Sequence, residues 1–137
     1  MRLFIVFALC SQTALSQPIS IKKLILYHTM CADSMSTITS IKQAGFNNVF
    51  YDGDKTILKG SQSVVLLYKT GGCIDAIEYR TLDSSTYKSW DVDLKSEGFE
   101  YRYSEKNYSV YSSDKYTVMA YKENSGYSLA VMERVGK

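Results

Sequence analysis

The sequence is poor in the residues that carry catalytic and metal chemistry. It has one histidine, three cysteines, one tryptophan and one proline in 137 residues. It contains no Gly-rich phosphate loop, no nucleophile elbow around a serine and no Cys-x-x-Cys pair. These absences exclude the signatures of nucleotide-binding proteins, serine hydrolases and thiol oxidoreductases. Because Pro18 is the only proline, there is no proline-rich linker, and residues 17–137 are expected to form one domain.

The charge is almost balanced. Sixteen Lys and Arg stand against fourteen Asp and Glu, which gives a formal net charge of +2. A nucleic-acid-binding protein is expected to carry a basic stripe or patch, and no run of Lys or Arg provides one here. Nucleic acid is therefore not an expected partner.

The first residues are the only part of the chain that resembles a targeting segment. Arg2 precedes an apolar run over residues 3–9, and small residues follow before Gln17. This order predicts a secretory signal peptide over residues 1–16 and an exported protein, periplasmic or extracellular. The apolar run is much shorter than the roughly 20 residues of a membrane-spanning helix, so no span is expected after cleavage. A lipid anchor on Cys10 is the alternative, although the bulky residues beside it argue against lipidation.

Removal of the signal peptide would leave two cysteines, Cys31 and Cys73. An even pair in an oxidising compartment predicts a disulfide between them. It would close a loop of about 43 residues and stabilise the fold by roughly 4 kcal/mol in the chain-entropy model. In a eukaryotic exported protein, Asn107 would also lie in an N-glycosylation sequon.

Similar patterns occur twice in the chain, 53 residues apart. Gly45 and Gly98 each follow a helical pattern, where a helix needs a residue with positive φ, and each is followed by Phe. The spacing predicts an α+β fold of two tandem helix-plus-antiparallel-sheet units, a pseudo-repeat with a period of 53 residues. Unit 1 would span about residues 19–80 and unit 2 about residues 83–135, with the helices packed on one sheet face.

Within this scheme a strand over residues 19–28 precedes the first helix. Helices are expected from residue 33 or 34 to Gly45, and from residue 83 to Gly98, with Ile38, Ile41, Trp90 and Leu94 as core anchors. The last strand, residues 127–134, is expected at a sheet edge, guarded by neighbouring charges. The remaining strands are expected over residues 46–51, 56–59, 63–69, 73–80, 99–103, 108–112 and 116–122. This layout is similar in architecture to the secreted β-lactamase inhibitor proteins, which are tandem helix-plus-sheet repeats with an aromatic-rich binding surface.

Tyrosine is abundant: the chain has twelve, and seven lie between Tyr101 and Tyr127. Strict alternation would place Tyr101 and Tyr103 on one face of a strand. Tyrosine is favoured at interfaces because it combines an apolar ring with a polar tip. We therefore predict a binding surface made of Tyr101, Tyr103, Tyr108 and Tyr116. The alternative is that tyrosine simply suits half-buried strands.

These features favour an exported binding or inhibitor-like module that uses a Tyr-rich sheet face to bind a protein partner. One alternative is a carrier of a small apolar ligand between sheet and helices. Another is an envelope or structural protein without catalytic activity.

An enzyme would have to use His28 with Cys31 as a nucleophile pair, but the predicted disulfide removes that thiol. A metal site would need His28, Cys31, Asp33 and Cys73, whose spacing does not resemble the close pairs of structural zinc sites. We therefore expect no catalytic residues, no metal and no cofactor.

Overall fold

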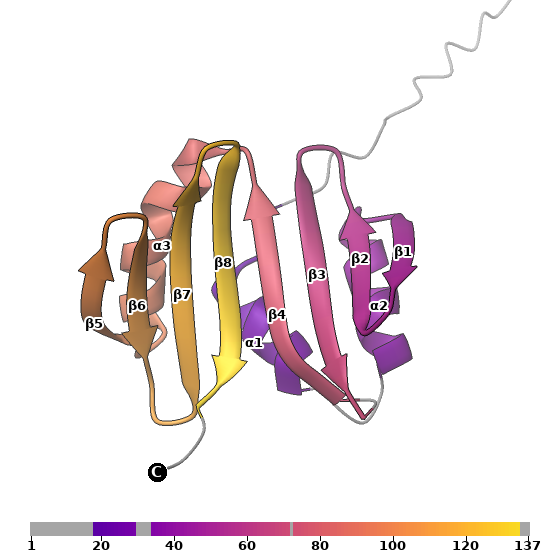
Figure 1. The fold of residues 1–137 in the computed structure, drawn as a ribbon, viewed down its shortest axis with the longest axis horizontal. Coiled ribbons are helices and arrows are strands. Elements are labelled where there is room, and N and C mark those ends of the chain that lie inside the picture. The colour runs from indigo at the N-terminus through magenta and orange to yellow at the C-terminus, as the bar shows by residue number, and fades with distance from the viewer. Residues whose placement is uncertain (1–17, 30–33, 72, 135–137) are drawn as a thin grey trace, which may run out of the picture.

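The computed structural model describes residues 18–29, 34–71 and 73–134 (Figure 1). These ranges form three helices and eight strands. In chain order they are α1 (Ile21–Thr29), α2 (Ser34–Gln43), β1 (Asn48–Asp52), β2 (Lys55–Lys59), β3 (Ser63–Thr70), β4 (Cys73–Thr81), α3 (Ser84–Ser96), β5 (Glu100–Glu105), β6 (Tyr108–Ser112), β7 (Tyr116–Glu123) and β8 (Gly126–Glu133).

All eight strands form one sheet in the order β1-β2-β3-β4-β8-β7-β6-β5, and every neighbouring pair is antiparallel. The prediction of two tandem helix-plus-sheet units with a period of 53 residues was therefore wrong, although the α+β class is roughly right. The reason is the pairing of β4 with β8, from Ala76 opposite Met132 to Thr81 opposite Tyr127, which joins all the strands into one sheet. The layout that resembled the β-lactamase inhibitor proteins is not the one observed.

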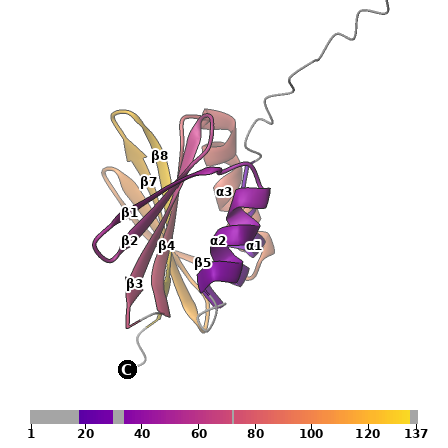
Figure 2. The same ribbon diagram turned by 90° about the vertical axis from the view of Figure 1, so that its right-hand side faces the viewer.

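The three helices lie on one face of the sheet (Figure 2). Helix α1 contacts β4 and β8 at the centre, α2 contacts β2, and α3 contacts β8 and β5. Helices α2 and α3 are followed by Gly45 and Gly98, whose φ values of 101° and 86° confirm the predicted role of these glycines. Across the described ranges, no helix has the length and apolar character needed to cross a membrane.

Residues 21–29 form a helix, and the prediction of a strand over residues 19–28 was wrong. The β-branched and apolar residues of this segment favoured a strand, but Ile21, Leu24 and His28 also recur at helical spacing and are buried. Ser20 supports the first turn, because its hydroxyl accepts a hydrogen bond from the Lys23 amide at 3.3 Å. Residues 21–29 are therefore compatible with either a strand or a helix, and packing against the sheet selects the helix.

Between the helices and the sheet lies a continuous hydrophobic core. The central strands β3, β4 and β8 contribute alternate residues to it, as the two-residue period of a strand requires. Helices α2 and α3 contribute the predicted anchors, and all four are confirmed as buried: Ile38, Ile41, Trp90 and Leu94.

The edges of the sheet are β1 and β5 (Figure 1). The strand expected at an edge, β8, instead pairs with β7 on one side and with β4 on the other. Flanking charges made its sequence resemble an edge strand. In the structure these charges lie near the strand ends, where solvent is accessible, so they do not interrupt the pairing.

Helix α1 provides a matched test of how the helical layer stabilises the sheet. Leu24 is fully buried and Leu26, two residues on, is 56% exposed. We expect Leu24→Ala to lower the free energy of unfolding by about 2–5 kcal/mol, because it leaves a cavity. Leu26→Ala should change it by less than about 0.5 kcal/mol. Urea unfolding of both variants measures these changes in the free energy of unfolding. Equal changes in the two variants would contradict the placement of α1.

Candidate functional site: the open face of the sheet

The second face of the sheet carries none of the described helices (Figure 2). Its middle row crosses all eight strands, because consecutive pairs in the strand register stand opposite each other. From β5 to β1 the row is Tyr103, Val110, Met119, Ala130, Glu78, Leu66, Ile57 and Phe50. Residues directly opposite on neighbouring strands point to the same side of a sheet. A single charged residue, Glu78, therefore interrupts a hydrophobic row that spans the open face.

One end of this face, over β5–β7, carries a tyrosine patch, which we define as Tyr103, Tyr108, Val110, Met119 and Tyr121. The ring centroids of Tyr103 and Tyr108 are 6.4 Å apart, and those of Tyr108 and Tyr121 are 5.7 Å apart. Such contacts fix the ring positions before any partner arrives. A hydrogen bond to Glu105 raises the pKa of Tyr108 to about 12, so its hydroxyl stays protonated at neutral pH.

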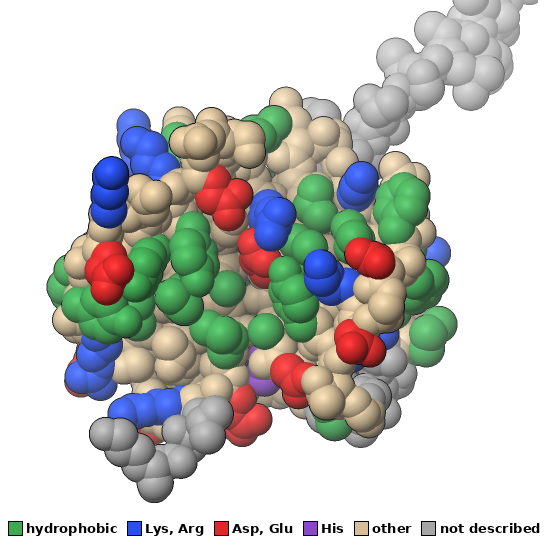
Figure 3. All heavy atoms as spheres, viewed as in Figure 1, with side chains coloured by type: hydrophobic (Ala, Val, Ile, Leu, Met, Phe, Trp, Pro, Cys, Tyr) green, Lys and Arg blue, Asp and Glu red, His purple; other side chains and the backbone are tan. Residues whose placement is uncertain are grey.

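The other end, over β1–β3, carries a second hydrophobic patch, which we define as Phe50, Ile57, Val64 and Leu66. Phe50 is 50% exposed, and the Lys59 ammonium lies 5.0 Å from the centroid of its ring. Figure 3 shows hydrophobic side chains over both ends of this face, with charged side chains between them. The open face thus has two hydrophobic areas and a polar centre.

The polar centre consists of Tyr68, Glu78 and Arg80. The Glu78 carboxylate accepts hydrogen bonds from the Tyr68 hydroxyl at 2.8 Å and from the Arg80 Nε at 2.6 Å. The Glu78 side chain is only 12% exposed, whereas that of Arg80 is 46% exposed. The bond to Glu78 raises the pKa of Arg80, and burial together with the same carboxylate raises the pKa of Tyr68. Glu78 therefore holds a half-exposed cation in a fixed position.

The four predicted site tyrosines do not share one surface. Tyr103 and Tyr108 lie on the open face, as described above. Tyr101 stands opposite Tyr111, whose hydroxyl donates to Asp91 of α3, so Tyr101 belongs to the helical side. Tyr116 is 6% exposed and packs against His28 of α1, with ring centroids 5.4 Å apart.

A break in the register explains why alternation failed for Tyr101 and Tyr103. The pairing of β5 with β6 shifts between these residues, as in a β-bulge, so one residue is added before Tyr103. An added residue reverses the side to which later side chains point. The Arg102 Nε donates to the Ser112 hydroxyl beside this break.

Packing accounts for His28, the residue on which an enzyme would depend. It is 6% exposed, and its Nε2 lies 2.9 Å from the Asp75 main-chain oxygen, where it donates a hydrogen bond. Cys73 is in a disulfide, and Cys31 and Asp33 lie outside the described residues, so the Cys31–Cys73 pairing stays a prediction. In the part of the chain that the structure describes, no three His, Cys, Asp or Glu side chains are grouped to hold a metal ion.

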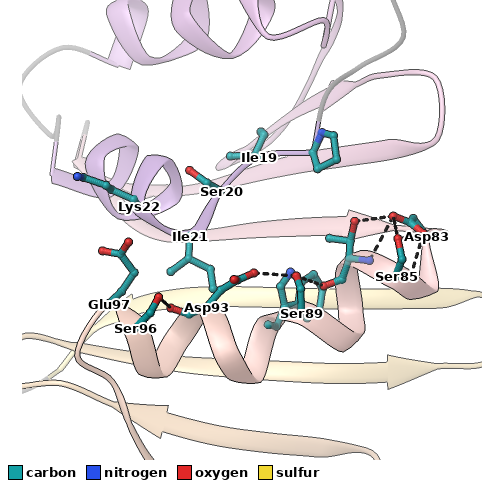
Figure 4. Close-up of a pocket in the computed structure, with 13 residues that line it drawn as sticks. Ile19, Ser20, Ile21, Lys22, Asp83, Ser85, Ser89, Asp93, Ser96 and Glu97 are labelled. Atoms are coloured by element: carbon teal, nitrogen blue, oxygen red, sulfur yellow. Dashed lines mark hydrogen bonds between the residues drawn. The ribbon is translucent and has the colours of Figure 1, made fainter.

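A groove of about 510 Å³ lies on the helical side, between the start of α1 and α3 (Figure 4). Ile19, Ile21 and Trp90 contribute apolar surface to it. Two of its three acidic residues are already engaged: Asp83 accepts from the Ser85 and Thr86 amides at the start of α3, and Asp93 accepts from the Ser89 hydroxyl. These carboxylates therefore stabilise α3 itself.

The Asp83 cap gives a pH-dependent prediction. Its hydrogen bonds to Thr86 and Ser85 lower the pKa of Asp83 from 3.8 to about 2. A lowered folded-state pKa adds stability above pH 3.8, and this is lost as the pH falls through about 2. Asp83→Ala should therefore lower the melting temperature at neutral pH, and the difference from wild type should shrink between pH 4 and pH 2.

Asp83→Asn is the matched control, because asparagine also caps helices but does not titrate. Thermal melts of the three proteins from pH 7 to pH 2 make the comparison. A wild-type stability with the same pH dependence as that of Asp83→Asn would contradict the assigned role of the charge.

The sequence reasoning missed Phe50, Tyr68, Arg80 and Tyr121 as members of one surface. Glu78 and Arg80 do alternate with the buried Ile77 and Tyr79, which indicates that they face away from the core. Comparison of the chain with models of protein families, with curated proteins and with solved structures finds no significant match. The open face of the sheet is therefore argued as a site from its geometry alone.

Proposed function

We propose that the protein is an exported binding module that holds a protein partner on the open face of its sheet. The observation that carries this proposal is the hydrophobic row across that face, interrupted by the bonded Tyr68–Glu78–Arg80 centre. Phe50 and Tyr103, at the two ends of the row, are each 50% exposed, whereas Leu66 and Val110 within it are buried. Exposed apolar patches of this kind typically mark an interaction site. A broad surface across eight strands fits a protein better than a small molecule, which needs a concave pocket, although a pocket of about 310 Å³ lies beside Val64 and Arg80.

The residue types on this face support a protein interface. Tyrosine and arginine are the residues most often found to dominate binding energy at interfaces, where they are surrounded by contacts that exclude water. Tyr103 and Arg80 are each about half exposed, 50% for the residue and 46% for the side chain, so each has further surface to bury. Neighbouring rings and Glu78 already restrict them, which lowers the entropy cost of binding.

The positive charge of Arg80 at the centre of the open face indicates which chemical group a partner would present to it. Glu78 engages the Nε of Arg80 and the Tyr68 hydroxyl also interacts with this guanidinium, whose five N–H donors exceed these two partners. A partner carboxylate facing Arg80 would form a charge-assisted hydrogen bond, flanked by hydrophobic contacts on both sides. We propose an apolar partner surface with an acidic residue at its centre.

The carrier alternative has less support. The grooves on the helical side, of about 510 and 360 Å³, are open and bordered by charged or polar side chains, including Lys22, Lys23 and Gln43. An apolar ligand needs a mainly hydrophobic lining. No observation favours an envelope or structural role over a binding role.

Tyr103 and Tyr101 allow a matched test of the open face. They lie on the same strand and are 50% and 49% exposed, but they point to opposite sides. We expect Tyr103→Ala to weaken partner binding about tenfold or more, because it removes a hydrophobic anchor. Tyr101→Ala should leave binding unchanged. Quantitative capture of partner proteins from the exported fraction of the source, with wild type and both variants as bait, measures the difference.

Equal losses in both variants would indicate an effect of the β5 edge as a whole. Capture of the same partners in the same amounts by all three proteins would refute binding through the tyrosine patch. Arg80→Ala extends the test to the polar centre, and Lys88→Ala, on the exposed side of α3, is its charge-matched control.

Export itself is testable by mass. We expect the protein from the exported fraction to lack residues 1–16 and to be lighter by the two hydrogens that a disulfide removes. Intact mass spectrometry without reduction measures both features. A chain that retains Met1 would contradict cleavage of the signal peptide, and one with two free thiols would contradict the disulfide. An acyl mass on Cys10 would indicate a lipid anchor in place of cleavage before Gln17.

A further inference from the structure

We propose that β1 is a self-association edge, where β1 of a second copy adds to the sheet as an antiparallel strand. This inference goes beyond the proposed function, because it concerns the sheet edge rather than the open face. An edge strand presents unpaired main-chain groups, and proteins that stay monomeric block them with charges, bulges or prolines. The two edges of this sheet, β1 and β5, differ in that protection.

The β5 edge is protected twice. A register irregularity interrupts its pairing between Tyr101 and Tyr103, and such a bulge twists an edge strand away from regular pairing. Three of its six residues, Glu100, Arg102 and Glu105, are charged, and all six are exposed. An incoming strand would meet both an irregular backbone and a row of charges.

The β1 edge has neither form of protection. Its register with β2 is regular from Asn48 opposite Lys59 to Asp52 opposite Lys55, and Asp52 is its one charged residue. Phe50 and Tyr51 are adjacent large side chains that are 50% and 68% exposed, on opposite sides of the strand. None of the described segments lies beyond this edge (Figure 1).

The main-chain geometry determines which groups of β1 point outward. A two-residue turn, with Gly53 at φ 56°, joins β1 to β2 and is closed by the pair Asp52 and Lys55. Hydrogen-bonded and non-bonded pairs alternate along an antiparallel ladder. The closing pair at Asp52 is hydrogen-bonded, so the next bonded pair along β1 is at Phe50. The main-chain groups of Val49 and Tyr51 therefore point away from β2.

Those outward groups allow one self-complementary register. If Phe50 stands opposite Phe50 of the second copy, Val49 stands opposite its Tyr51, and both have outward main-chain groups. Asn48 then stands opposite Asp52 of the second copy, so no like charges face each other. Aromatic pairs and pairs of an aromatic with a β-branched residue are favourable across strands. Twofold symmetry repeats each contact, as expected for an isologous dimer.

Proline at Tyr51 tests the proposal directly. It removes the outward amide but no bond to β2, and proline is tolerated on edge strands when its nitrogen faces solvent. We expect the mature wild-type protein to form a dimer in sedimentation velocity at rising concentration. Tyr51→Pro should weaken that dimer about 30-fold, because symmetry removes two main-chain hydrogen bonds.

Ser104→Pro is the matched control on the other edge. The pair Glu105 and Tyr108 closes the β5–β6 turn, so by the same alternation the Ser104 amide points away from β6. This variant should dimerise like wild type. Phe50→Lys provides a second test that needs no proline, since it places like charges opposite each other, and circular dichroism checks that every variant is folded.

The register is tested by cysteine cross-linking. Phe50→Cys should form an intermolecular disulfide, because the two copies of this residue lie directly opposite each other, whereas the equally exposed Tyr103→Cys should not. A wild-type protein that stays monomeric at millimolar concentration would overturn the proposal. So would a dimer that Tyr51→Pro leaves unchanged, or one that Tyr103→Cys links and Phe50→Cys does not. Partner capture by a monomeric Tyr51→Pro protein would leave the proposed function intact, so the two proposals can fail separately.

Discussion

The pairing of β4 with β8 is the contact on which the rest of the structure depends. It joins two four-stranded meanders into one sheet, and it places Ile77 beside Val131 and Tyr79 beside Leu129 on the side of the core. Helix α1 packs across this central pair and contacts both strands. Burial of Leu24 against the centre of the sheet therefore connects the first described helix to the last strand.

The same pairing creates the site. Because β4 is central, Glu78 and Arg80 lie in the middle of the open face, with hydrophobic patches on both sides. The carboxylate of Glu78 is nearly buried and accepts two hydrogen bonds, as a buried charge requires. The helices remove one face of the sheet from solvent, which leaves the other as the broad surface on which we propose that a partner binds.

Much of the local structure could be predicted from the sequence, because it depends on neighbouring residues. The helix that ends at Gly98, the turn at Gly53 and the strands around them follow from capping, turn and alternation rules. What could not be predicted depends on contacts between distant segments. Residues 21–29 fit both a strand and a helix, and only their contact with the sheet decides between the two.

In the candidate site, too, some features follow from neighbouring residues and others depend on contacts between distant segments. Alternation correctly separated Glu78 and Arg80 from the buried Ile77 and Tyr79. It could not show that Tyr68 lies beside Glu78, since that depends on the β3–β4 register, nor that a bulge moves Tyr103 away from the side of Tyr101. The abundance of tyrosine indicated a surface, but the register decided which tyrosines belong to it.

The central position of β8 also has a consequence for the order of folding. Strand β8 follows the other seven described strands in the chain, yet it lies in the middle of the sheet. Until β8 emerges, β4 and β7 both present an unpaired edge, and the second meander, β5–β7, lacks its fourth strand. The eight-stranded sheet can therefore close only after β8 has been made, and long-range pairing of this kind makes folding slow. For the export that we propose, this delay favours a chain that is still unfolded during synthesis.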